Sequence, residues 1–302
     1  MLARNILDAW SACARLAALA LCTTLAAFPA HPAERFEQGL LWRIEGKGAA
    51  ASHVFGTIHL ADPRVTRLPD AVAREFGQAR SLTIEASLDS SNLLALANRM
   101  LFTDGRDLPG VAGVELFGKT AALGAGLGLP EPALRMFKPW AVAVLLSVPQ
   151  QDPAGVLDYV LARMAVEQGK PVLELESLDE QISVFEGMSE GDQVALLRHS
   201  VDEYERLPQV MSRLVEAYLA RDLAGMGRIS EESGGRSEEA KRLNEVFSRR
   251  LIYDRNVRMA ERMEARLGDG RAFIAVGALH LYGGRGVLSL LERRGWRVTR
   301  VY

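Results

Sequence analysis

The sequence predicts an α/β fold of the α+β type, with a mixed β-sheet core formed by both chain ends and a large helical insertion between them. Two observations support this prediction. Short β-rich runs gather near the two ends of the chain, such as the apolar run 272–276, which is too short for a helix and is followed by Gly277. Helical periodicity dominates from about residue 90 to 267. Because strands must bury their apolar faces, we expect the two ends to pair in space.

The amino-terminal strands are predicted as a β-hairpin. Residues 37–45 and 51–58 have strand patterns, and the turn sequence Gly46-Lys-Gly48 joins them. His59 falls where the second strand ends, and a helix with proline in its first turn is expected over 69–78.

Three further strands and one further helix complete the predicted core. The run 81–86 is a strand with the carboxylate of Glu85 near its end, and 170–176 is another strand. At the carboxyl end, 287–295 reads as an amphipathic helix that stops at a glycine, and 296–302 as a closing strand.

Two polar or glycine-rich stretches inside the helical block are predicted as loops. Ser230 to Glu239 is expected to be the most exposed loop. The glycines of Gly124-Ala-Gly126-Leu-Gly128 lack the spacing and the preceding strand of a dinucleotide-binding loop, so a flexible loop is expected there.

Residues 1–33 are predicted to be a cleaved signal peptide. Arg4 and Arg15 flank its start, and the apolar core 16–28 is shorter than the roughly 20 apolar residues that a membrane span needs. Several small residues compete as the cleavage site. We therefore expect an exported, periplasmic or secreted protein, with no membrane span in the mature chain.

Composition narrows the chemistry that the mature chain can perform. Both cysteines, Cys13 and Cys22, lie in the leader, so a metal would have to be held by imidazole and oxygen ligands. The formal net charge is -2, and no basic stripe with interleaved aromatic residues indicates nucleic-acid binding.

A repeated motif marks the candidate site. Gly56-Thr-Ile-His59 and Gly277-Ala-Leu-His280 both close a strand pattern, and ligands commonly bind at the carboxyl ends of strands in α/β sheets. Two imidazoles plus the Glu85 carboxylate form a common ligand set for a catalytic divalent metal with an open position for water. Glu85 could be the third ligand or the general base, and the sequence does not separate these roles.

The chain carries an ordered set of motifs: Trp42-x-Ile, the two Gly-x-x-His motifs, Glu85, Lys138-Pro-Trp140, Leu175-Glu176 followed by Gln181, and Arg255-Asn256. In their order along the chain they resemble the TraB/GumN family, which includes the TIKI metalloproteases and is similar to the erythromycin esterase and ChaN group. The resemblance implies one domain over 34–302 with a helical insertion at about 90–267. It also implies metal-dependent peptide cleavage by the two histidines and the glutamate.

The resemblance also bears on Arg255 and Asn256, which lie in a predicted helix over 251–267. Arg255 would neutralise an oxyanion or hold a substrate carboxylate, with Glu176 as its strand-end partner, and Asn256 would donate a hydrogen bond. The alternative is a solvated helix face. His53 is predicted to be a surface or cross-strand residue.

We therefore expect an exported metal-dependent hydrolase, a TIKI-like metallopeptidase that acts on a peptide or protein. The donor set suits zinc, manganese, cobalt or iron, and similarity to the TIKI proteins points to manganese or cobalt. Two alternatives stay open: a non-catalytic periplasmic protein that binds a peptide or haem in the same cleft, and an esterase-type hydrolase.

Overall fold

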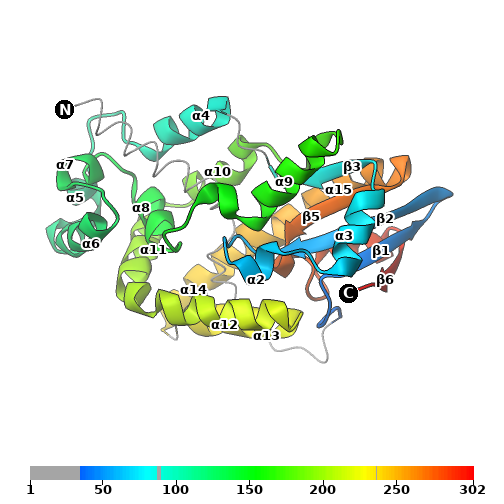
Figure 1. The fold of residues 1–302 in the computed structure, drawn as a ribbon. Coiled ribbons are helices and arrows are strands. Elements are labelled where there is room, and N and C mark those ends of the chain that lie inside the picture. Colours follow the sequence, from blue (N-terminus) through cyan, green and yellow to red (C-terminus); the bar gives the residue numbers. More distant parts are fainter. Residues whose placement is uncertain (1–34, 87–89, 236) are drawn as a thin grey trace. The chain divides into compact units, whose positions relative to one another are not determined.

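The computed structural model describes residues 35–86, 90–235 and 237–302 (Figure 1). The predicted signal peptide lies outside the described residues. By internal contacts the chain divides into two compact units. The described residues of one unit, the sheet unit, fall in 35–86, 154–177 and 210–302, and those of the other, the helical unit, in 90–153 and 178–209.

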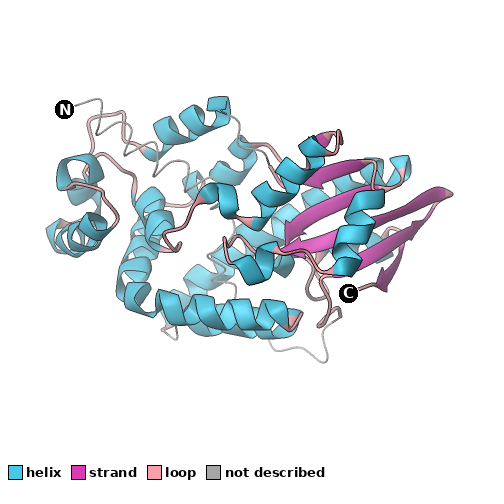
Figure 2. Cartoon of the chain, viewed as in Figure 1, coloured by secondary structure: helices cyan, strands magenta, loops and turns pink. Residues whose placement is uncertain are grey.

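The sheet unit is built on one six-stranded mixed sheet (Figure 2). Its strands lie in the order β4-β3-β5-β2-β1-β6. Their bounds are β1 Leu41–Gly46, β2 Ala49–Thr57, β3 Ser81–Ile84, β4 Val172–Glu174, β5 Ala272–Gly277 and β6 Arg297–Arg300. The predicted fold class is confirmed, because strands from both ends of the chain share this sheet.

Strand direction follows from the connections. β1 and β2 form the predicted antiparallel hairpin, and β6 pairs antiparallel with β1. In the other half of the sheet, β2, β5, β3 and β4 run parallel to one another. Such parallel pairs need crossover connections, which here are helical. β5 is buried at all six positions, as expected for a central parallel strand.

An aromatic cluster anchors α3 (Asp70–Gln78) to this sheet. The Phe273 ring of β5 lies 5.8 Å from Phe55 of β2 and 5.2 Å from Phe76 of α3, centroid to centroid. Each fully buried aromatic side chain contributes about 1.5–3 kcal/mol through the hydrophobic effect. α15 (Asp254–Asp269) passes behind the strands in the view of Figure 1.

The remaining elements are mostly short helices. Outside the helical unit they are α2 Pro63–Thr66, α9 Leu157–Glu167, α13 Leu223–Ser233, α14 Glu238–Phe247, a π-helix Ser248–Tyr253, a 3-10 turn Ala278–His280 and α16 Val287–Arg293. In the helical unit they are α4 Ser90–Met100, α5 Leu108–Ala112, α6 Val114–Gly126, α7 Glu131–Leu134, α8 Pro139–Leu146, α10 Leu178–Glu186 and α11 Glu190–Glu203. α12 is Leu207–Leu219.

The core of the helical unit is centred on α8. All eight of its residues are buried, and Trp140 stacks on Phe185 of α10 with ring centroids 5.4 Å apart. A helix that is apolar all round must be covered on every side, which the helices of this unit do for α8.

Two loop predictions in the helical block hold only in part, because helices extend into both stretches. Ser230 is only 1% exposed because α13 continues to Ser233, and Asn244 closes the short connection to α14 by donating to the Gly234 carbonyl at 2.9 Å. Gly124 and Gly126 belong to α6, where a Cβ at Gly124 would meet Leu134 at 3.3 Å. In both stretches tertiary packing overrides the local turn signals.

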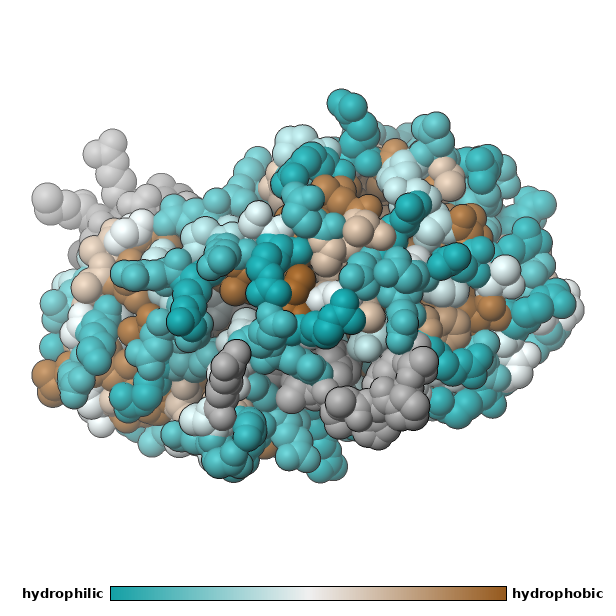
Figure 3. Space-filling model, turned by 90° about the horizontal axis from the view of Figure 1, so that it is seen from below, coloured by the Kyte–Doolittle hydropathy of each residue, from teal (hydrophilic) through white to brown (hydrophobic). Residues whose placement is uncertain are grey.

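Among the described residues, none of the helices combines the length and apolar character needed to span a bilayer. On the face drawn in Figure 3, polar side chains surround small, scattered apolar areas.

Candidate functional site

Three neighbouring parallel strands bring the predicted metal ligands to the same end of the sheet, at the carboxyl ends of the strands. Thr57 at the end of β2 pairs with Gly277 at the end of β5, and β5 also pairs with β3. His59, His280 and Glu85 follow these three strand ends within one to three residues. Residues that are remote in sequence therefore lie at the same end of the sheet, as the repeated motif predicts.

The first motif glycine is explained by a close approach. A Cβ at Gly56 would lie 2.8 Å from Leu281 Cδ1 and 3.0 Å from Ala278 Cα, so the turn that carries His280 packs directly on β2. Tyr218 of α12 fixes the same point by donating to the Gly56 carbonyl at 2.9 Å. The Gly277 amide instead donates to Glu85 Oε1 at 2.7 Å. The two glycines therefore serve different contacts.

His280 is fully buried and held in one orientation. Its Nδ1 lies 2.6 Å from Asn256 Oδ1, and Asn256 Nδ2 donates to the Arg285 carbonyl at 2.9 Å. Because a carbonyl can only accept, the amide nitrogen faces Arg285 and the amide oxygen faces the ring. Nδ1 therefore carries the proton and Nε2 the lone pair.

The free lone pair of His280 points toward Glu85. Nε2 forms no hydrogen bond with any described residue, and it lies 3.7 Å from Glu85 Oε1. Burial lowers the pKa of His280 well below its usual value, and Arg255 and His59 lower it further. The ring is therefore neutral, which is the form that binds metals.

The second histidine, His59, lies beside the carboxylate of Asp158. It is 9% exposed, and its Nδ1 lies 2.8 Å from Asp158 Oδ2. Thr57 Oγ1 donates to Asp158 Oδ1 at 2.8 Å. Burial lowers the pKa of His59, but the charge and hydrogen bond of Asp158, helped by Glu85, outweigh it and leave that pKa raised.

Asp158 is the site residue that the sequence analysis missed. It lies in the first turn of α9, where an acidic residue is expected to stabilise the helix and attracts no notice. Its pKa is lowered: burial raises it, but His59 and the Thr57 hydroxyl together lower it by more. Its local sequence resembles an ordinary helix start, so only the fold shows its partner.

A buried ion-pair network holds Glu85. Arg255, only 1% exposed, places Nη2 2.6 Å from Glu85 Oε2 and Nε 2.8 Å from Glu176 Oε2. Arg258 adds a 2.6 Å contact to Glu176 Oε1. Burial raises the pKa of Glu85, although Arg255, His59 and the Gly277 amide pull it down. The expected Glu176 partner is present, and a solvated face for Arg255 and Asn256 is wrong.

A π-helix immediately precedes these two residues. It spans Ser248–Tyr253, and Arg255 and Asn256 follow in the first turn of α15. Arg255 reaches the acidic pair while Asn256 reaches His280, so two consecutive side chains both serve the site. π-helical turns shift the register of a helix and occur often at functional sites.

The side chains of His59, His280 and Glu85 do not form a complete metal site in this arrangement. Among the described residues, no group of three or more His, Cys, Asp or Glu side chains is arranged so that it could hold a metal ion. His280 Nε2 and Glu85 Oε1 lie 3.7 Å apart, and His59 follows the end of the neighbouring strand β2.

The chain is similar in sequence to several known proteins. The chain is 24% identical to the Uncharacterized protein YbaP of Escherichia coli (strain K12), over 76% of this chain and 84% of that protein. It is 26% identical to Metalloprotease TIKI1 of Danio rerio over 85% of this chain, and 25% identical to Metalloprotease TIKI1 of Homo sapiens over the same share. The alignments span 62% and 61% of the two metalloproteases.

No solved structure matches this chain. The sequence profile of the TraB/PrgY/gumN family matches residues 40–300, from the strand before the first motif to the last strand. This match covers most of the 302 residues. The chain therefore belongs to the TraB/PrgY/gumN family.

Proposed function

We propose that the protein is a metal-dependent hydrolase in which His59, His280 and Glu85 hold a divalent ion. The observation that carries this proposal is the matched support of the two imidazoles. The Nδ1 of each ring lies beside an oxygen atom, Asp158 Oδ2 at 2.8 Å for His59 and Asn256 Oδ1 at 2.6 Å for His280. Metal-binding histidines usually have such an acceptor on the nitrogen that does not bind the metal.

The donor chemistry fits a divalent ion, and the side chains have to close around it from their present arrangement. His280 Nε2 is neutral and forms no hydrogen bond with the described residues. Glu85 accepts hydrogen bonds from Arg255 and Gly277, but each carboxylate oxygen has a second lone pair. Glu85 can therefore be a ligand without leaving its present partners.

The protein's own residues prepare this site for hydrolysis. A bound ion would supply a water whose pKa falls to about 7 in zinc enzymes. Asp158 and Asn256 fix the rings, and Arg255 keeps Glu85 in place. Because the Arg255 guanidinium is buried and hydrogen-bonded to Glu85, Glu176 and the Leu251 carbonyl, it acts through Glu85. The raised pKa of Glu85 also suits a proton acceptor.

A peptide or protein is the proposed substrate, and the periplasm or the exterior the proposed location. Relatives named metalloproteases support the first point, and the leader-like residues 1–33 support the second. Zinc, manganese and cobalt all suit imidazole and carboxylate donors.

Metal content is the first test. Protein that begins at residue 34 should retain about one equivalent of a divalent ion, measured by elemental analysis after purification without chelator, or bind Zn²⁺, Mn²⁺ or Co²⁺ at one site by calorimetry. His280→Ala should lose this binding while keeping its circular dichroism spectrum. His199→Ala, on α11, is the matched control and should bind normally.

Turnover is the second test. Cleavage of a mixed peptide library, followed by mass spectrometry, should stop on chelation and return with added metal. The proposal is wrong if the unmodified protein binds no divalent ion. Binding of peptide without turnover, unchanged in His280→Ala, would instead support the binding-protein alternative.

A further inference from the structure

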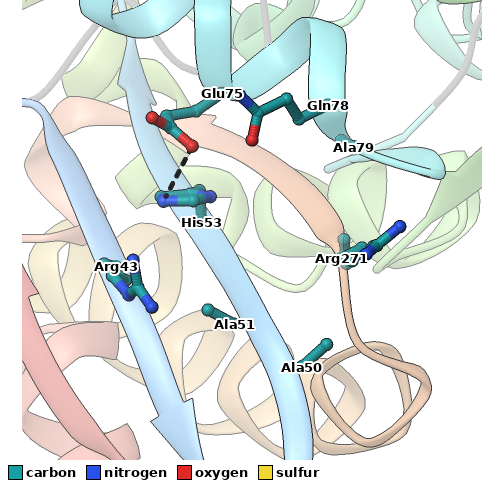
Figure 4. Close-up of a pocket in the computed structure, with 9 residues that line it drawn as sticks. Arg43, Ala50, Ala51, His53, Glu75, Gln78, Ala79 and Arg271 are labelled. Atoms are coloured by element: carbon teal, nitrogen blue, oxygen red, sulfur yellow. Dashed lines mark ion pairs between the residues drawn. The ribbon is translucent and has the colours of Figure 1, made fainter.

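A second site lies at the opposite end of the same strands. A pocket of about 570 Å³ is lined by residues that include Arg43, His53, Glu75, Gln78 and Arg271 (Figure 4). His53 precedes the end of β2 by four residues, so at about 3.3 Å per residue the pocket is roughly 13 Å or more from the candidate site. The chemistry proposed for His59 and His280 does not use it.

The pocket has an excess of positive charge. The Glu75 carboxylate is already engaged, 3.0 Å from Arg74 Nε and 3.6 Å from His53 Nε2. Arg43 contacts Glu45 at 2.7 Å, but this pair is exposed and weak. The Arg271 side chain forms no hydrogen bond or ion pair with the described residues. Arg43 and Arg271 lie on opposite sides of the His53–Glu75 pair in Figure 4.

Arg271 also has a backbone conformation that its side chain disfavours. Its φ is 55°, in the left-handed region that glycine and asparagine adopt most easily. Among the described non-glycine residues with positive φ, the other three, Phe36, Lys47 and Arg221, each contact an aromatic ring or a carboxylate. Arg271 gains no comparable contact within the protein. Strained residues of this kind are concentrated at sites that clamp ligands.

The rest of the pocket suits a small organic anion. His53 is 9% exposed, and burial lowers its pKa, so a neutral imidazole faces the pocket. Four alanines, at positions 50, 51, 79 and 272, leave room and an apolar surface. Arginine side chains recognise carboxylate and phosphate groups through paired N–H donors.

We propose that this pocket binds a small anion that carries a carboxylate or phosphate group, with Arg271 as the main anchor and Arg43 as the second. The pocket volume of about 570 Å³ lies within the range found for small-molecule binding sites.

The test uses inorganic phosphate and succinate as two separate probes, each titrated calorimetrically into the protein at low ionic strength. Saturable binding of one ion per chain is expected for at least one probe, and the better probe identifies the anionic group. Arg271→Gly should weaken binding at least about tenfold. The same variant should unfold at a temperature equal to or above that of the parent, because glycine relieves the left-handed strain.

Arg221→Gly is the matched control, since Arg221 has a φ of 60° and lies outside the pocket lining. It should bind the probe like the parent. His280→Ala should also bind it normally, which separates this site from the proposed metal site. The proposal is overturned if neither probe saturates at millimolar concentrations, or if Arg271→Gly binds as well as the parent.

Discussion

At the scale of single residues, the site depends on side chains that hold other side chains. Asp158 illustrates this, because its carboxylate accepts from Thr57 and faces His59 Nδ1 at 2.8 Å. Asp158→Ala should lower metal affinity about 10–100-fold without removing a ligand. Asp158→Asn, which keeps an acceptor oxygen, should lose less. Metal affinity by calorimetry measures both, and equal losses would contradict an orienting role.

Glu167→Ala is the appropriate control for this prediction. Glu167 is the last residue of α9, which carries Asp158 in its first turn, but the Glu167 side chain is 66% exposed. Its removal should leave metal affinity unchanged.

Arg255 provides a second prediction, on stability. Arg255→Ala would leave Glu85 and Glu176 buried without their shared cation, which should cost about 3–5 kcal/mol in the free energy of unfolding. Arg258, another partner of Glu176, has a side chain that is 32% exposed. Arg258→Ala should therefore cost less than half as much unfolding free energy. Urea denaturation compares the two. If the two variants lost similar amounts of unfolding free energy, the burial of Arg255 would contribute little to stability.

His53 predicts a pH dependence of stability. Burial lowers its pKa below the usual 6.5, although Glu75 pulls it upward. Between the lowered pKa and 6.5, the unfolded chain binds a proton that the folded chain does not, so the free energy of unfolding falls as the pH drops below about 6.5. His53→Gln should reduce this fall. Denaturation at several pH values measures the difference, and parallel curves would refute the prediction.

At the scale of elements, the contact between β2 and the turn Ala278–His280 sets the position of His280. Gly56→Ala should cost about 1–3 kcal/mol in the free energy of unfolding, because its Cβ would overlap Leu281 and Ala278. Gly268→Ala, on α15 with no atom within 4 Å of an added Cβ, should instead be neutral or stabilising. Thermal denaturation checks the pair, and a tolerated Gly56→Ala would show that this contact is loose.

Sequence patterns predicted the strands well and the supporting network poorly. The run at β5 and the hairpin of β1 and β2 have strong periodicity and clear turn residues, which act locally. Asp158 has no local signal, since its role depends on a partner about a hundred positions away. The loop expected over 230–239 is shorter than predicted for the same reason, because Asn244 closes that connection from the next helix.

At the scale of the whole molecule, the last strand completes the sheet. β6 pairs with β1, and Trp296 Nε1 donates to Glu264 at 2.9 Å. Truncation after Gly295 would leave β1 as an unpaired edge, and unpaired edges promote aggregation. We expect a lower unfolding temperature and association by light scattering, and a monomer of unchanged stability would argue against it. A chain that ends at Arg300 should behave more like the parent.

The backbone amides of Leu40 and Leu41 both donate to the carbonyl of Tyr302, at 2.7 and 3.1 Å. The start of β1 and the residues that follow β6 are thus neighbours, close enough for a few added residues to bridge them. A circularly permuted gene that joins them and reopens the chain elsewhere would bring both Gly-x-x-His motifs into one continuous half of the polypeptide. We expect such a permuted protein to form the same sheet, with the two histidines at the same strand ends.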